Sequence, residues 1–206
     1  IRERDDTMKL AGVKHIGIIG LGMIGDSLSV LTTGHGCRTT CLARNPDKIP
    51  GYEKTYDGYF RQMIEQGLMP EGQLEICKKY LTYTLDIADL KDCDVIFECV
   101  FEDIELKHQI YADIEANCPD VNVICSVSSS FVPDVLAQKA TKYKDRIIVT
   151  HPFNPAHMVP FFELCGGSAT GEGVLQYAKE VLESLDRKPV ILKKPAPGFI
   201  GNRLQF

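Results

Sequence analysis

Three closely spaced glycines constrain the fold of this chain more than any other feature. Gly20, Gly22 and Gly25 form a G-x-G-x-x-G pattern. The apolar run His15–Ile19 precedes the pattern, and a stretch with helical spacing follows it from about Met23 to Thr33. A strand, a glycine turn and a helix in this order are typical of the first βαβ unit of a dinucleotide-binding fold.

Each glycine has a physical reason for its place. Gly20 permits the tight turn, Gly22 allows backbone to approach a pyrophosphate, and Gly25 allows the helix and the strand to pack closely. The first N–H groups of the helix and its dipole then attract the anion. The sequence therefore predicts a pyrophosphate site made by Gly20, Gly22, Met23, Ile24 and Gly25.

Apolar runs alternate with amphipathic stretches along the rest of the chain, which is typical of a parallel sheet. The expected further strands are 38–42, 81–85, 95–100, 121–126, 147–150, 158–164 and 190–192. The expected further helices are 105–116, 132–142 and 172–185, with an inserted helical hairpin formed by 52–67 and 73–80. We therefore predict an α/β fold of the Rossmann type, with a doubly wound, mostly parallel sheet.

The ends of the chain differ from this pattern. Residues 1–6 are polar and aperiodic, and we expect residues 1–11 to form a flexible lead. Residues 12–194 are expected to form the Rossmann domain. A new helix begins at Phe199, after a Pro-Gly turn, and the sequence stops about two turns later. We interpret 195–206 as the start of a truncated C-terminal helical domain.

Composition limits the partners and the compartment. A formal net charge of −5 gives no support to nucleic-acid binding, which requires a basic surface. The apolar runs are too short to span a membrane. The eight cysteines show no C-x-x-C pair and no metal-site spacing, so we interpret them as reduced core thiols and predict a cytoplasmic location with no metal.

The end of the second strand bears on the choice of cofactor. NAD sites usually carry an acid there, which binds the ribose hydroxyls. Here Ala43 occupies that position and Arg44 follows it. An arginine can pair with a 2′-phosphate, which favours NADP. Alternatively, Arg44 is an exposed residue and Asp47 or a backbone group contacts the ribose, so NAD and NADP both remain open.

Four segments of the chain, the glycine turn and three that carry polar residues suited to catalysis, form an ordered set. They are the glycine turn, the serines 128–130 after a strand, the segment His151-Pro152-Phe153-Asn154-Pro155 with Glu163 twelve residues beyond the histidine, and Pro197-Gly198-Phe199-Ile200-Gly201-Asn202-Arg203. Together, in this order, they resemble the 3-hydroxyacyl-CoA dehydrogenase family over nearly the whole chain. The histidine segment is most similar to the branch that contains carnitine dehydrogenase and the lambda-crystallin-like gulonate dehydrogenase.

The resemblance implies a role for each residue. His151 would be the general acid/base, which suits a neutral imidazole, and Glu163 would orient it. Ser129 and Asn202 would bind the substrate oxygen.

The resemblance also implies further cofactor contacts. Asn154 would lie on the nicotinamide side, and Ser129 would also lie near the cofactor. Glu102 and Lys107 match the cofactor-proximal residues of the family, although Lys107 could instead be a solvated helix residue.

The resemblance implies an NAD(P)-dependent oxidoreductase of fatty acid metabolism that oxidises a 3-hydroxyl to a ketone. It also implies a homodimer formed through the C-terminal domain. Two departures weaken acyl-CoA as the substrate. Val127 and Ser128 replace the Asn and Thr of the acyl-CoA members, and the stretch after the second strand has few unopposed basic residues. A dehydrogenase of a free 3-hydroxy acid, such as carnitine or gulonate, is the first alternative, and a non-enzymatic crystallin-like protein is the second.

Overall fold

The computed structural model describes residues 12–195 and 198–203. They form one eight-stranded sheet in the order β3-β2-β1-β4-β5-β6-β7-β8. The strands are β1 His15–Ile19, β2 Arg38–Leu42, β3 Leu81–Thr84, β4 Val95–Glu98, β5 Val123–Ser126, β6 Ile147–Pro152, β7 Phe161–Cys165 and β8 Lys188–Ile191. Every neighbouring pair is parallel except β6 and β7, which are antiparallel. The predicted Rossmann-type fold is confirmed.

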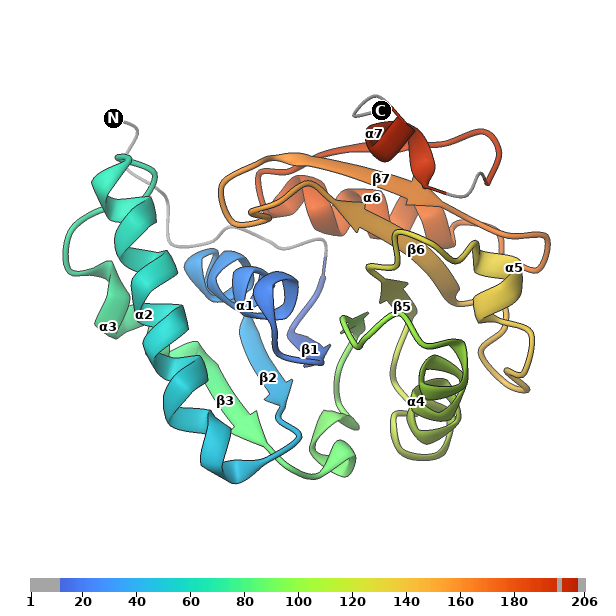
Figure 1. The fold of residues 1–206 in the computed structure, drawn as a ribbon, viewed down its shortest axis with the longest axis horizontal. Helices are drawn as coiled ribbons and strands as arrows, with labels where there is room; N and C mark the ends of the chain where they lie inside the picture. The colour runs from blue at the N-terminus through green and yellow to red at the C-terminus, as the bar shows by residue number, and fades with distance from the viewer. Residues whose placement is uncertain (1–11, 196–197, 204–206) are drawn as a thin grey trace.

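Helices cover both faces of the sheet (Figure 1). The helices are α1 Met23–Gly34, α2 Ile49–Glu65, α3 Gln73–Cys77, α4 Ile104–Asn117, α5 Pro133–Leu136, α6 Val174–Ser184 and α7 Phe199–Arg203, with short 3-10 turns at Pro46–Lys48, Lys78–Tyr80 and Ile87–Leu90. α1 and α6 pack on one face, and α4, α5 and α7 pack on the other. Strands β1, β4, β5 and β6 are buried along their whole length, because helices cover them on both sides.

The inserted helical hairpin is confirmed, and it packs beside α1. Figure 1 shows α2 and α3 next to α1 and β3. A separate apolar cluster joins the three helices, and its buried members include Val30, Tyr56 and Phe60. The Tyr56 hydroxyl also lies 2.7 Å from Thr33 Oγ1. The hairpin therefore covers the side of α1 that the sheet leaves open.

The predicted helix 132–142 is wrong beyond its first turn. α5 ends at Leu136. The carboxylate of Glu115, on α4, accepts hydrogen bonds from the backbone N–H groups of Thr141, Lys142 and Tyr143 at 2.7–2.8 Å. In a longer helix those N–H groups would bond to carbonyl groups of the preceding turn. Glu115 takes the place of those carbonyl groups, so the helix does not extend to residue 142.

The other expected elements are present, with bounds that shift by a few residues. No helix in the described part of the chain is long and apolar enough to cross a membrane. Within the same residues, no group of three or more His, Cys, Asp and Glu side chains has the arrangement of a metal site. All eight cysteines are free thiols, and all but Cys99 are buried.

Candidate active site

The glycine turn connects β1 to α1, and two of its glycines have no room for a side chain. Gly20 has φ +95°, and a Cβ atom there would lie 2.7 Å from the backbone of Cys99. A Cβ atom at Gly25 would lie 2.1 Å from the carbonyl oxygen of Gly20. Both positions therefore require glycine, the first for its conformation and the second for the closeness of α1 to the turn.

The start of α1 is open to an anion. Gly22 is the N-cap residue, and no side chain caps the first N–H groups of the helix. A Cβ atom at Gly22 would meet nothing within 4 Å among the described atoms. Met23 is exposed, whereas the Ile24 side chain packs against the core, so Ile24 offers only its backbone to a ligand. Free N–H groups beside open space fit a pyrophosphate.

The carboxyl end of β2 carries no acid. Ala43 is buried, and Arg44 is exposed. Neither side chain forms a hydrogen bond or an ion pair with the residues that the structure describes. Arg44 is therefore open to solvent at the end of β2.

His151 and Glu163 form a buried pair on adjacent antiparallel strands. They are register partners on β6 and β7, and His151 Nδ1 lies 3.0 Å from Glu163 Oε2. Glu163 is fully buried. Its Oε1 accepts the N–H groups of Ile200 and Gly201, at 2.9 and 3.2 Å. No described residue forms a hydrogen bond with the other ring nitrogen of His151, Nε2, which leaves that nitrogen available to a substrate.

Two aromatic rings enclose the imidazole of His151. Phe199 stacks on it with 5.2 Å between ring centroids, and Phe153 meets its edge at 6.1 Å. A Cβ atom at Gly201 would lie 2.1 Å from the Phe153 ring, so glycine allows α7 to approach. The sequence motifs contain both phenylalanines, but the contact of Phe199 with His151 depends on α7 packing against β6.

Glu102 holds the serine loop after β5. Its carboxylate accepts hydrogen bonds from Ser128 Oγ at 2.9 Å, from the Ser129 N–H at 2.7 Å and from Ser129 Oγ at 3.3 Å. Ser128 Oγ also accepts the N–H of Phe131 at 2.9 Å, so Ser128 stabilises the turn after β5. Ser129 is only partly buried.

Lys107 is fully buried and is therefore not a solvated helix residue. Its ammonium lies 2.8 Å from Glu98 Oε1 and 3.5 Å from Glu102 Oε2. Glu98 is also fully buried and accepts further hydrogen bonds from the Tyr111 hydroxyl at 2.8 Å and the Ser126 hydroxyl at 2.6 Å. Our sequence reasoning missed Glu98, because its neighbours on β4 give no sign of an ionic partner. The network links β4, α4 and the serine loop.

The loop between β6 and β7 is tied to α1 through His157. His157 Nδ1 lies 2.7 Å from Ser27 Oγ, and the ring of Tyr59 stacks on the imidazole at 4.6 Å. Burial, together with the charge of Arg187, lowers the pKa of His157 to about 4. Asn154 is exposed in the same loop. The backbone of Asn202 lies in α7, and its side chain is outside the described residues.

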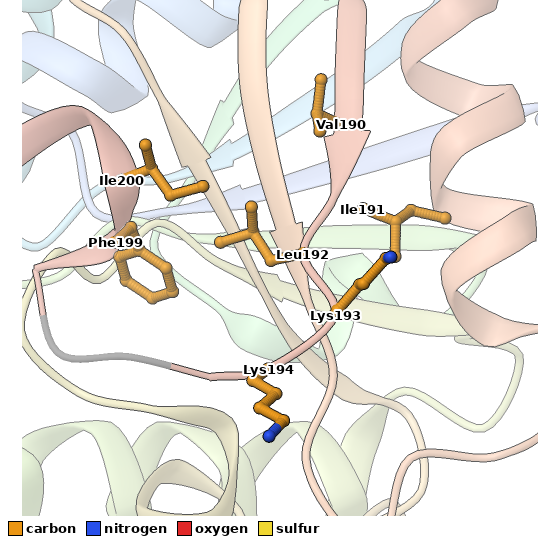
Figure 2. Close-up of a pocket in the computed structure, with 7 residues that line it drawn as sticks. All are labelled: Val190, Ile191, Leu192, Lys193, Lys194, Phe199 and Ile200. Carbon is orange, nitrogen blue, oxygen red and sulfur yellow. The ribbon is translucent and has the colours of Figure 1, made fainter.

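An apolar hollow of about 380 Å³ lies between the end of β8 and α7. Figure 2 shows Leu192, Phe199 and Ile200 around it, with Lys193 and Lys194 on the strand end. Phe199 lines this hollow and also stacks on the imidazole of His151. The Phe199 ring therefore links this hollow to the His151–Glu163 pair.

The arrangement defines a class of protein. A doubly wound sheet with a glycine turn at the start of α1 is a dinucleotide-binding domain. The chain belongs to the family of 3-hydroxyacyl-CoA dehydrogenase NAD-binding domains, which matches residues 15–195. It is therefore an NAD-binding domain.

Known relatives agree with this assignment. The chain is 32% identical over 190 residues to L-carnitine dehydrogenase of Mesorhizobium japonicum, covering 90% of this chain and 50% of the relative. It is 33% identical over 196 residues to L-carnitine dehydrogenase of Oceanobacillus iheyensis, covering 93% and 61%. The crystal structure of FadB2 from M. tuberculosis superposes with a TM-score of 0.86 at 25% identity, covering 93% and 67%. The chain thus spans about half to three fifths of the length of these two carnitine dehydrogenases.

Proposed function

We propose that this chain is part of an NAD-dependent dehydrogenase that oxidises a 3-hydroxyl group to a ketone. The buried His151–Glu163 pair, with 3.0 Å between Nδ1 and Oε2, carries the proposal. Glu163 accepts a hydrogen bond from Nδ1–H in the proposed tautomer, so Nε2 is the nitrogen with a free lone pair. Nε2 then takes the proton of the substrate hydroxyl, and the carboxylate stabilises the imidazolium that results.

The nicotinamide, when bound, accepts the hydride that leaves the carbon. The chain's own contribution is to hold the groups in place. The turn at Gly20–Gly25 supports the cofactor, and the Glu102 carboxylate fixes the loop that carries Ser129. We propose that Ser129 and Asn202 bind the substrate oxygen and that Asn154 lies on the nicotinamide side.

The substrate has two candidates. A 3-hydroxyacyl-CoA is the first, supported by the family description and by the apolar hollow beside His151. A free 3-hydroxy acid such as carnitine is the second, supported by the names of two relatives above 30% identity. The full-length protein, assayed for NADH oxidation with acetoacetyl-CoA and for NAD reduction with L-carnitine, separates them.

Failure on both substrates, together with an absence of NADH binding, would refute the proposed activity. We also propose a cytoplasmic homodimer that assembles through the helical segment from residue 195 onward. Light scattering on the full-length protein tests the dimer.

A further inference from the structure

Asp26 is a buried carboxyl group without a partner. It lies in the first turn of α1 and is only 6% exposed. Among the described residues, no donor forms a hydrogen bond or an ion pair with its carboxylate. Three other carboxylates are buried among the described residues, and each accepts several hydrogen bonds. They belong to Glu98, Glu115 and Glu163. Asp26 is therefore the exception.

An unpartnered buried carboxylate destabilises a folded protein. Burial accordingly raises the pKa of Asp26 to about 7. The start of α1 also faces the space beside Gly22, where no described atom would meet a Cβ atom within 4 Å. An unsatisfied polar group next to an open anion site is typical of a site that a ligand completes.

The position of Asp26 indicates which part of a dinucleotide it meets. It lies one turn before Val30, on the side of α1 that packs against α2. Its charge acts on Cys41 of β2 and Tyr83 of β3, which are register partners. Ala43 follows Cys41 by two residues and therefore points to the same face of the sheet. Asp26 thus lies between the start of α1 and the carboxyl end of β2.

The adenosine ribose of a dinucleotide binds at this end of β2 when the pyrophosphate lies on α1. The acid usually found on β2 is absent, because Ala43 has no polar side-chain atom and Arg44 is exposed. Asp26 lies on α1, which packs beside β2. The hydroxyl groups of the ribose are hydrogen-bond donors, which is what a lone carboxylate lacks.

We propose that Asp26 accepts a hydrogen bond from the 2′-hydroxyl of the adenosine ribose and excludes a 2′-phosphate, so that the site selects NADH over NADPH. The inference rests on the proposed function, because it requires a dinucleotide on the glycine turn. Asp26 takes the role of the missing β2 acid. Arg44 then remains a solvated residue.

Fluorescence titrations with NADH and with NADPH at pH 8 test the assignment. The first variant is Asp26→Asn, which keeps the shape of the side chain. The control is Glu53→Gln, which removes an exposed carboxylate of α2 whose charge also acts on Tyr83. We expect the protein to bind NADH at least about tenfold more tightly than NADPH. Asp26→Asn should reduce that ratio by about tenfold, the effect of one charge-assisted hydrogen bond, whereas Glu53→Gln should leave it within about twofold.

Thermal unfolding of the same variants provides the folding control. Asp26→Asn and Asp26→Ala should raise Tm at pH 8, because each removes an ionised carboxylate that has no partner. An unchanged NADH/NADPH ratio in a folded Asp26→Asn variant would overturn the inference, as would a preference of the unmodified protein for NADPH, which would instead give Arg44 the role. If the unmodified protein binds neither dinucleotide, the proposed function itself fails.

Discussion

His151 and Glu163 face each other across two antiparallel strands, with 3.0 Å between Nδ1 and Oε2. The backbone register of β6 and β7 sets this spacing, because the two residues are direct pairing partners. A loop would hold the two side chains less precisely. The one antiparallel pair in the sheet therefore lies where the proposed chemistry needs a fixed imidazole.

Glu163→Gln should reduce kcat by about 10²-fold or more and change KM little, because the amide cannot stabilise the imidazolium. Steady-state kinetics of the full-length protein measure both constants. Glu183→Gln, on the exposed side of α6, is the control for loss of a charge. A kcat within threefold of the unmodified value would contradict the acid/base role of the pair.

Gly25→Ala should abolish NADH binding and lower Tm, because the new methyl group would lie 2.1 Å from the Gly20 carbonyl oxygen. Gly58→Ala is a matched control within α2, where a Cβ atom would meet nothing within 4 Å. That change should stabilise the protein by about 0.4–1 kcal/mol. Equal effects of the two substitutions on Tm would show that the turn is not closely packed.

The contribution of His157 to the free energy of unfolding should fall as the pH drops from about 6.5 towards 4, whereas Asp26, with a folded-state pKa of about 7, contributes in the opposite sense. Burial keeps its folded-state pKa near 4, so the unfolded chain binds a proton at a pH where the folded chain does not. Denaturant titrations between pH 4 and 7 measure the slope. His157→Gln should flatten it, although the loss of the Tyr59 stack lowers stability at pH 7 as well. An identical slope in the variant would assign the acid sensitivity to other groups.

Lys107→Met should destabilise the protein by about 3–5 kcal/mol, because it leaves the buried Glu98 carboxylate without its cation. The double variant Glu98→Gln, Lys107→Met should lose less than the two single variants added together. Lys139→Met, which breaks the exposed pair with Glu105, should have little effect. Urea unfolding gives the four values, and strict additivity at the buried site would argue against a coupled pair.

The sequence predicted the sheet better than the helices. β1 and β2 have the expected bounds, His15–Ile19 and Arg38–Leu42, because short apolar runs next to glycine turns are local signals. The prediction of helix 132–142 was wrong because the Glu115 carboxylate accepts backbone N–H groups of residues 141 and 142. Glu115 is distant in the sequence, so no local pattern reveals this contact.

The candidate site was predicted in parts. The motifs identified His151 and Glu163, and the register of β6 and β7 shows why they meet. The burial of Lys107 could not be predicted, because its partner Glu98 lies on a different element. Asp26 escaped notice for a similar reason. Only the packing of α1 against β2 and β3 shows that the Asp26 carboxylate has no partner among the described residues.

Glu163 serves two structural elements at once. The carboxylate that forms a hydrogen bond with His151 Nδ1 also accepts hydrogen bonds from the N–H groups of Ile200 and Gly201 at the start of α7. Each of these donors shares the carboxylate with the imidazole. A displacement of α7 would therefore remove hydrogen bonds that hold the Glu163 carboxylate in place beside the ring. The position of a peripheral helix is in this way transmitted to the orientation of the His151 imidazole, although the two lie on different elements.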